Sequence, residues 1–165
     1  MSDDPKKDKS RATSYTAELE IKWEFYGHFV RDDKHKLKIE FENEVRDVNK
    51  PGIYKLISKD RSELYVGEGR NLINRLNKYR NARHELEETK EGTDRRIQGW
   101  MLRMIEQKKG PIEIFVCTEA YILCADEKKQ KLDLITRHNR ILIENLEISI
   151  RAEKFRIQND RKNWE

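Results

Sequence analysis

Apolar and charged residues alternate strictly near the start of the chain, which predicts an N-terminal β-hairpin. Every second residue of segments 19–25 and 37–41 is apolar, and the polar segment 31–36 separates them. This period of two is typical of strands that turn one face toward a core. Apolar side chains between residues 19 and 30 also fit a helical stripe, but the unbroken alternation favours a strand.

A second hairpin is predicted where two short apolar runs lie on either side of a turn. Apolar and β-branched residues fill most of segments 53–57 and 64–66, and the polar sequence Lys59-Asp60-Arg61-Ser62 lies between them. Each run contains one tyrosine, Tyr54 and Tyr65. On neighbouring strands the two phenols can project from the same face, as in a pocket.

The rest of the chain contains helical spacing and one further strand. Residues 71–81 and a segment that begins near Thr93 predict two helices. Residues 112–117 predict a third core strand, with apolar side chains on both faces as a central strand has. Residues 127–153 predict a long final helix. Its inward face would consist of Leu134, Ile135, His138, Ile141 and Leu142.

This order of elements predicts the α+β class. We expect a small antiparallel sheet of three core strands flanked by helices, in the order ββααβα, with the N-terminal hairpin added. A chain of 165 residues fits one domain. We expect this domain to span residues 49–165 and the hairpin extension residues 15–48. Residues 1–14 are mostly charged or small, and we expect them to form a flexible tail.

Charge adds information through its distribution more than through its sum. Charged residues make up 40% of the chain, but the net charge is only +4, which does not by itself indicate a nucleic-acid partner. Between Gly69 and His84, however, there is no acidic residue. Such a segment attracts a phosphate backbone, although it could also be a solvated helix face. The basic residues in it are Arg70, Arg75, Lys78, Arg80 and Arg83.

Cysteine and hydropathy patterns argue against several classes of protein. The chain has two cysteines, Cys117 and Cys124, whose spacing fits neither a zinc ligand pair nor a redox CxxC motif. There is no apolar leader and no apolar run near the length of a membrane span. We therefore expect a cytoplasmic protein without a membrane partner.

The two tyrosine-bearing tripeptides, Gly52-Ile53-Tyr54 and Tyr65-Val66-Gly67, resemble the signature of the GIY-YIG nuclease family. Valine replaces isoleucine in the second tripeptide. Arg75 follows Tyr65 by ten residues, Tyr79 lies one helical turn further, and both positions match the first helix of the family. The resemblance extends over about two thirds of the chain. It implies that Tyr54, Tyr65, Arg75 and Tyr79 belong to a catalytic site.

The resemblance also implies a divalent cation bound by a glutamate of the last helix, with an asparagine downstream. Glu144 follows the apolar run Ile141-Leu-Ile and precedes Asn159 by fifteen residues, so it is the candidate catalytic residue and metal ligand. Glu147 is the alternative, although it lacks the apolar run. Hard cations prefer oxygen ligands and keep several waters, so one carboxylate plus substrate phosphate suffices. We expect Mg²⁺, with Mn²⁺ as a substitute.

These groups together predict hydrolysis of a phosphodiester bond. The metal at Glu144 would stabilise the leaving oxygen, and Arg75 would donate hydrogen bonds to the phosphate. Tyr54 is the candidate general base, with Tyr65 as its hydrogen-bonding partner. A phenol with a pKa of about 10 needs roughly 4 kcal/mol of help to act as a tyrosinate at pH 7. Otherwise Tyr54 only orients the water, and the sequence leaves both versions open.

The expected partner is double-stranded DNA, and the expected activity is that of a metal-dependent endonuclease. A restriction-like enzyme of this size could act as a symmetric homodimer. A nicking, repair or mobile-element nuclease fits nearly as well, as does a DNA-binding module without turnover. Glu68 stands where some relatives have a lysine. An acid at this position would lower the local positive potential or could join the metal site, and either change would affect activity. The predicted DNA contacts are Arg70, Lys78, Arg80, Arg83 and Asn159.

Overall fold

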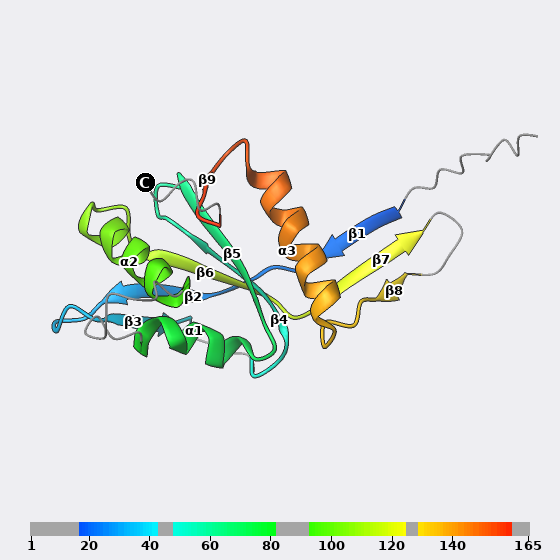
Figure 1. Ribbon diagram of the computed structural model, residues 1–165, viewed down its shortest axis with the longest axis horizontal. Helices are drawn as coiled ribbons and strands as arrows, with labels where there is room; N and C mark the ends of the chain where they lie inside the picture. Colours follow the sequence, from blue (N-terminus) through cyan, green and yellow to red (C-terminus); the bar gives the residue numbers. More distant parts are fainter. Residues whose placement is uncertain (1–16, 43–47, 82–92, 125–128, 160–165) are drawn as a thin grey trace, which may run out of the picture.

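The computed structural model describes residues 17–42, 48–81, 93–124 and 129–159. Two antiparallel sheets and three helices occupy these segments (Figure 1). In chain order the elements are β1 (Ala17–Ile21), β2 (Glu24–Arg31), β3 (Leu37–Phe41), β4 (Gly52–Ile57), β5 (Glu63–Gly69), α1 (Leu72–Asn81), α2 (Thr93–Glu106), β6 (Ile112–Cys117), β7 (Ala120–Cys124), β8 (Gln130–Lys131), α3 (Arg137–Arg151) and β9 (Arg156–Ile157).

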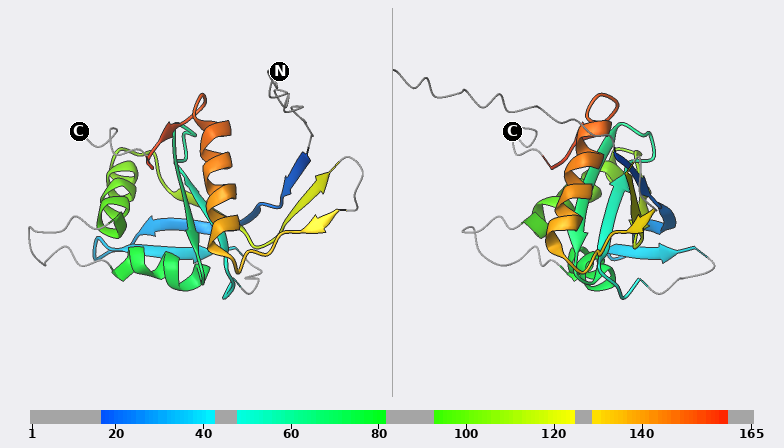
Figure 2. Two further views of the ribbon diagram at one scale, coloured as in Figure 1. Left: turned by 45° about the vertical axis from the view of Figure 1, so that its right-hand side comes forward. Right: turned by 90° about the vertical axis from the view of Figure 1, so that its right-hand side faces the viewer.

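The larger sheet has six strands in the order β3-β2-β6-β4-β5-β9. All neighbours are antiparallel except β5 and β9. Helices α1 and α2 pack on one face of the sheet, and α3 packs on the other face against β4 and β5 (Figures 1 and 2). The predicted α+β class and the order ββααβα of the core elements are confirmed.

Strand β4 is buried along its whole length because helices cover both faces of the sheet. Alternate residues of β4 therefore contribute to two separate cores. Tyr54 and Leu56 belong to the core under α1 and α2, whereas Ile53 and Ile57 belong to the core under α3. Within the first signature tripeptide, Tyr54 therefore faces α1 and α2, and Ile53 faces α3.

The predicted N-terminal hairpin is present as β2 and β3. Its strands pair from Gly27 opposite Phe41 to Arg31 opposite Leu37. The hairpin is not an appendage, however, because β2 also pairs with β6 and so extends the main sheet. The earlier part of the expected strand separates as β1, which pairs with β7.

A three-stranded sheet, β1-β7-β8, projects from the body of the molecule (Figures 1 and 2). Its last strand, β8, takes residues that we predicted to be helical, and the helix expected over 127–153 begins only at Arg137. The expected flexible tail, residues 1–14, lies outside the described residues. Within the described part of the chain, no helix is long and apolar enough to cross a membrane.

The inward face predicted for the last helix is wrong except for Leu134, which is buried just before α3 begins. Ile135 is 70% exposed and Leu142 is 50% exposed, whereas the buried residues of α3 are Arg140, Ile143 and Glu147. The prediction assumed that only apolar side chains turn inward. Here two charged side chains are buried because each has partners of opposite charge on the sheet or on the same helix.

A buried ion pair joins α3 to β4. Lys55 donates a hydrogen bond from Nζ to Oε1 of Glu147 at 2.9 Å, and Arg151 approaches the same oxygen at 3.1 Å. The Lys55 ammonium also lies 4.1 Å from the ring centre of Trp23. Burial lowers the pKa of Lys55, and Glu147 opposes this shift. The pair fixes the helix to the strand next to Tyr54.

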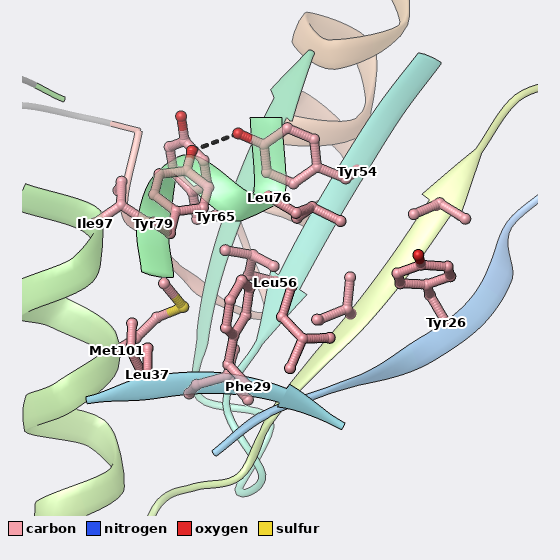
Figure 3. Close-up of a cluster of buried hydrophobic side chains, with 14 of the residues drawn as sticks. Tyr26, Phe29, Leu37, Tyr54, Leu56, Tyr65, Leu76, Tyr79, Ile97 and Met101 are labelled. Carbon is pink, nitrogen blue, oxygen red and sulfur yellow. Dashed lines mark hydrogen bonds between the residues drawn. The ribbon is translucent and has the colours of Figure 1, made fainter. Parts of the chain in front are cut away.

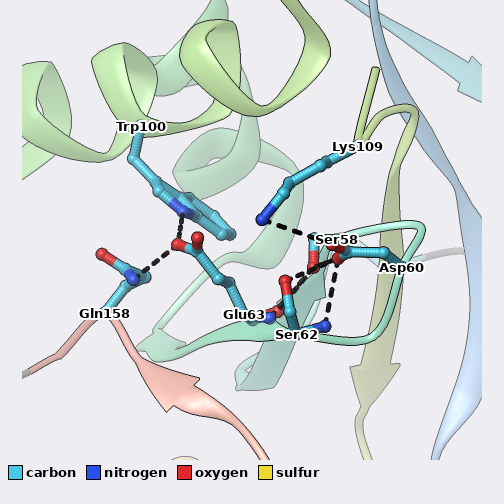
Figure 4. A network of polar contacts seen from close by, with 7 residues as sticks. All are labelled: Ser58, Asp60, Ser62, Glu63, Trp100, Lys109 and Gln158. Carbon is cyan, nitrogen blue, oxygen red and sulfur yellow. Dashed lines mark hydrogen bonds and ion pairs between the residues drawn. The ribbon is translucent and has the colours of Figure 1, made fainter. Parts of the chain in front are cut away.

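The start of β5 is held by a second polar network (Figure 4). The buried Glu63 accepts hydrogen bonds on Oε2 from Trp100 of α2 and from Gln158 after β9, each at 2.7 Å. In the preceding turn, Asp60 accepts hydrogen bonds from Ser58 and Ser62. These contacts join the signature hairpin to elements on either side of it.

Substituting Glu147 by Gln should destabilise the fold by about 3 kcal/mol, because it leaves the Lys55 charge buried without a counter-ion. The double variant Lys55→Met/Glu147→Leu should lie within about 1 kcal/mol of the wild type, since both charges leave together. Urea unfolding of the three proteins measures the difference. A cost below about 1 kcal/mol for the single variant would mean that the pair does not hold α3.

Candidate functional site

Three tyrosines from two strands and a helix converge on one side of the larger sheet (Figure 3). Tyr54 lies opposite Gly67 and Tyr65 lies opposite Leu56, so the two tyrosines are diagonal neighbours on the same face. Their ring centres are 6.1 Å apart. The Tyr79 hydroxyl from α1 hydrogen-bonds the Tyr54 hydroxyl at 2.5 Å. The structure thus brings together the three phenols that the sequence predicted to meet.

The glycines of the two tripeptides make this arrangement possible. A Cβ at Gly67 would lie 2.3 Å from the Tyr54 hydroxyl oxygen and 2.4 Å from the ring carbon that carries it. A Cβ at Gly52 would lie 2.3 Å from the backbone oxygen of Cys117 on β6. Contacts this short are not tolerated, so Gly67 leaves room for the Tyr54 phenol and Gly52 lets β4 approach β6 closely.

Arg75 of α1 lies beside the phenols. Its guanidinium carbon is 5.4 Å from the ring centre of Tyr79, within the range of a cation–π contact. Nη1 donates to Oδ1 of Asp94 on α2 at 2.6 Å. Burial opposes the charge on Arg75, but Tyr54, Tyr79 and Asp94 outweigh it and raise the pKa of the guanidinium above its usual value. Arg75 is therefore a permanent cation at the site.

Asp94 is the residue of this site that the sequence did not reveal. It follows Arg75 by nineteen residues on a different helix, so no helical or strand periodicity connects the two. The only signal was its position in the first turn of α2, where an acid is favourable for any helix.

The two central phenols are neutral at physiological pH. Burial, followed by the neighbouring Tyr65, raises the pKa of Tyr54 well above its usual value, and Arg75 opposes the shift only in part. Burial and the adjacent Tyr54 likewise raise the pKa of Tyr79. Both side chains are fully buried. Of the two roles predicted for Tyr54, this environment favours the orienting phenol over the tyrosinate.

Glu144 lies in the middle of α3, a helix whose first half lies beside the end of β5 and the start of α1 (Figures 1 and 2). Burial, and then the charge of Glu68, raise the pKa of Glu144 to about 7. Arg137 and Arg75 act in the opposite direction. The charge of Arg75 on α1 thus reaches Glu144 on α3, although it acts less than burial, Glu68 and Arg137.

Glu68 is held by the arginines of α3. Its Oε2 accepts a hydrogen bond from Nε of the buried Arg140 at 2.6 Å, and its Oε1 lies 3.3 Å from Nε of Arg137. Arg140 also donates to the backbone oxygens of Leu134 and Ile135. The acid that departs from the family pattern thus helps to dock the start of α3 on β5.

The donor chemistry around Glu144 fits a hard divalent cation. Among the described residues, no side chain forms a hydrogen bond or an ion pair with Glu144, whereas Glu147 is occupied by Lys55 and Arg151. The described residues contain no group of three or more His, Cys, Asp or Glu side chains that could bind a metal. A cation here would therefore take one protein carboxylate and complete its shell with water and substrate oxygens.

The predicted DNA contacts differ in their surroundings. Arg70, Lys78 and Arg80 are exposed at the start of α1 and along it, and Arg83 lies outside the described residues. Asn159 is engaged elsewhere. Its amide accepts a hydrogen bond from the Val66 nitrogen at 2.9 Å and donates one to the Val66 oxygen at 2.6 Å, so it pairs with β5 as a strand would.

Comparison with known proteins places this geometry in a family context. Residues 50–131 match the GIY-YIG catalytic domain. A solved structure of a mutant of EndoII from bacteriophage T4 is similar in fold, with a TM-score of 0.51 and 19% sequence identity over 78% of this chain and 86% of that chain. No curated protein gives a significant sequence match.

Substituting Glu144 by Gln should stabilise the protein at pH 8. The pKa of about 7 in the folded state lies above the ordinary value of 4.5. The charged carboxylate is therefore disfavoured by folding, and its contribution to stability falls as the pH rises through this window. We expect the variant to gain roughly 1–3 kcal/mol at pH 8 and progressively less toward pH 4.5. Urea unfolding across pH measures this, with Glu153→Gln as an exposed control. An equal effect of the two substitutions would contradict the raised pKa.

Proposed function

The chain belongs to the GIY-YIG nuclease family, and on this premise we propose that it is a metal-dependent endonuclease that hydrolyses phosphodiester bonds of double-stranded DNA. The proposal is supported by the Tyr54–Tyr79 phenol pair with Arg75 beside it, and by Glu144, which has no partner among the described residues and whose pKa the charge of Arg75 helps to lower. A permanent cation, neutral hydroxyl groups and a carboxylate without a described partner are the groups that phosphodiester hydrolysis needs.

Mg²⁺ bound at Glu144, with Mn²⁺ as a substitute, would supply Lewis acid chemistry for the scissile phosphate and the leaving oxygen. Arg75 donates hydrogen bonds to a non-bridging oxygen of that phosphate, and these strengthen as negative charge develops. Asp94 holds one end of the guanidinium, which leaves the remaining donors for the substrate.

Tyr54 and Tyr65 orient the attacking water. Either hydroxyl can donate in the hydrogen bond between Tyr54 and Tyr79, and in both cases the Tyr54 oxygen keeps a lone pair that can accept a hydrogen bond from the water. Because burial keeps the phenol neutral, Tyr54 orients the water and passes a proton on without acting as a tyrosinate, and the proton that the water loses ends on the leaving oxygen. Tyr65, whose side chain is 5% exposed, completes the position of the water from the neighbouring strand.

The exposed basic residues of α1 bind the DNA backbone. Arg70, Lys78 and Arg80 come after β5 and lie close to Arg75 in the chain. Phosphates on either side of the scissile phosphate can therefore contact them. Their contacts carry affinity and orientation but no base sequence. We favour a restriction-like enzyme that acts as a homodimer, and a nicking, repair or mobile-element nuclease would use the same site.

A DNA-binding module without turnover is the second candidate, and Glu68 is the observation that favours it. Its charge helps to raise the pKa of Glu144 to about 7, so the metal ligand is half protonated near neutral pH. Metal binding then competes with a proton, which weakens a site that has only one protein carboxylate.

Cleavage of supercoiled plasmid distinguishes the two candidates. Wild-type protein should nick or cut the plasmid with Mg²⁺ or Mn²⁺, and Glu144→Ala should reduce the rate at least about a hundredfold because the metal ligand is lost. DNA affinity measured in EDTA should change by less than about threefold. Glu153→Gln is the control and should cleave normally. If the wild type is inactive with both metals but binds DNA, the module without turnover is the function.

Salt dependence of DNA binding tests the basic residues. Lys78→Gln and Arg80→Gln should each weaken binding to DNA of any sequence and lower the slope of log K against log salt by about 1. Fluorescence anisotropy with a short duplex measures both quantities. Lys34→Gln, at the exposed turn between β2 and β3, should leave the slope unchanged. An equal change in all three variants would place the DNA elsewhere.

A further inference from the structure

We propose that Asp94 is a positioning residue for Arg75, which sets the guanidinium in the orientation that the scissile phosphate requires. This inference rests on the proposed nuclease function and names a residue that the resemblance to the family did not supply. The contact that carries it is the ion pair between Nη1 of Arg75 and Oδ1 of Asp94 at 2.6 Å.

The pair joins two helices at the edge of the phenol cluster. Arg75 projects from α1 and Asp94 from the first turn of α2, and these helices pack on the same face of the sheet. The side chain of Arg75 is 23% exposed and that of Asp94 is 34% exposed. The ion pair is thus partly buried, and its exposed part can still contact a substrate.

Arg75 is held on two sides by fixed groups. The Tyr79 ring lies against the guanidinium, and the Cβ and Cγ of Arg75 lie 3.2 and 3.5 Å from the position that a Cβ would take on Gly69. The ring and the strand restrict the stem and one face of the plane. Rotation of the plane depends on its hydrogen-bond acceptors, which are the Tyr54 hydroxyl and, as the charged partner, Asp94. A hydrogen bond from Nη1 to a carboxylate fixes that rotation, because the guanidinium is planar and its donors have set directions.

A partly exposed ion pair between two helices contributes little to folding stability. Its larger effect is on a long side chain that would otherwise sample many rotamers, so preorganisation of Arg75 is the main consequence. Asp94 also places a negative charge near the incoming phosphate. This charge lowers affinity for DNA in the ground state, while the orientation that it imposes on Arg75 favours the transition state.

Because of these two effects, one substitution should change DNA affinity and the cleavage rate in opposite directions. Asp94→Asn keeps the size of the side chain and an acceptor oxygen but removes the charge. Binding of a DNA duplex in EDTA should stay unchanged or tighten by up to about fivefold. The single-turnover cleavage rate with Mg²⁺ at saturating protein should fall at least about tenfold. Glu106→Gln is the matched control, since it breaks another exposed ion pair of α2, with Arg31, far from the phenols.

A second comparison tests whether Asp94 acts through Arg75. In an Arg75→Lys background, Asp94→Asn should cause less than about a twofold further loss, because the planar group that it orients is gone. Asp94→Glu should recover part of the rate. A cleavage rate that rises or stays the same in Asp94→Asn overturns the proposal, as does an equally large loss in the Arg75→Lys background. Thermal unfolding of each variant separates these results from misfolding.

The proposal stays testable if the wild type does not cleave DNA, which is the outcome that would end the nuclease function. Nitrogen-15 NMR of the arginine side chains reports whether the guanidinium of Arg75 rotates slowly, and the Arg75→Lys variant assigns its signal. Slow rotation in the wild type that is lost in Asp94→Asn and kept in Glu106→Gln supports positioning. Slow rotation that persists in Asp94→Asn overturns it.

Discussion

The close approach of β4 and β5 is the constraint on which the site depends. Tyr54 lies opposite Gly67, and its phenol occupies the space that any side chain at that position would need. The same register places Tyr65 on the same face and Glu68 on the opposite face. A shift of β5 by one residue would turn Tyr65 toward α3 and Glu68 toward α1. The glycine therefore specifies the register as well as the pocket.

The two faces of the β4–β5 hairpin carry different groups of the site. The face under α1 and α2 carries the neutral phenols and Arg75, while the face under α3 carries Glu68, Lys55 and their partners. Glu68 and Glu147 on the α3 side each have two basic partners, whereas Glu144 forms no hydrogen bond or ion pair with any described residue. Pairing of its neighbours fixes α3 in register and leaves one carboxylate available.

Local patterns predicted the elements close to the signature well. The two hairpins, both helices after the signature and the central strand β6 were all predicted, because each has a regular period and a clear boundary. The sequence analysis did not predict β7, and it assigned the two residues of β8 to the last helix. It misplaced the inward face of α3 because Arg140 and Glu147 are buried as ion pairs. Asp94 was missed because only tertiary packing brings it to Arg75.

The pairing of β2 with β6 has a consequence for the limits of the catalytic unit. The family match begins at residue 50, yet β6 uses β2 as one of its two neighbours in the sheet. A shortened chain that began at Pro51 would leave the backbone of β6 open along one edge, with Ile112 and Ile114 uncovered, and open edges of this kind promote association with other chains. We therefore expect the smallest part of this chain that folds by itself to include the β2–β3 hairpin.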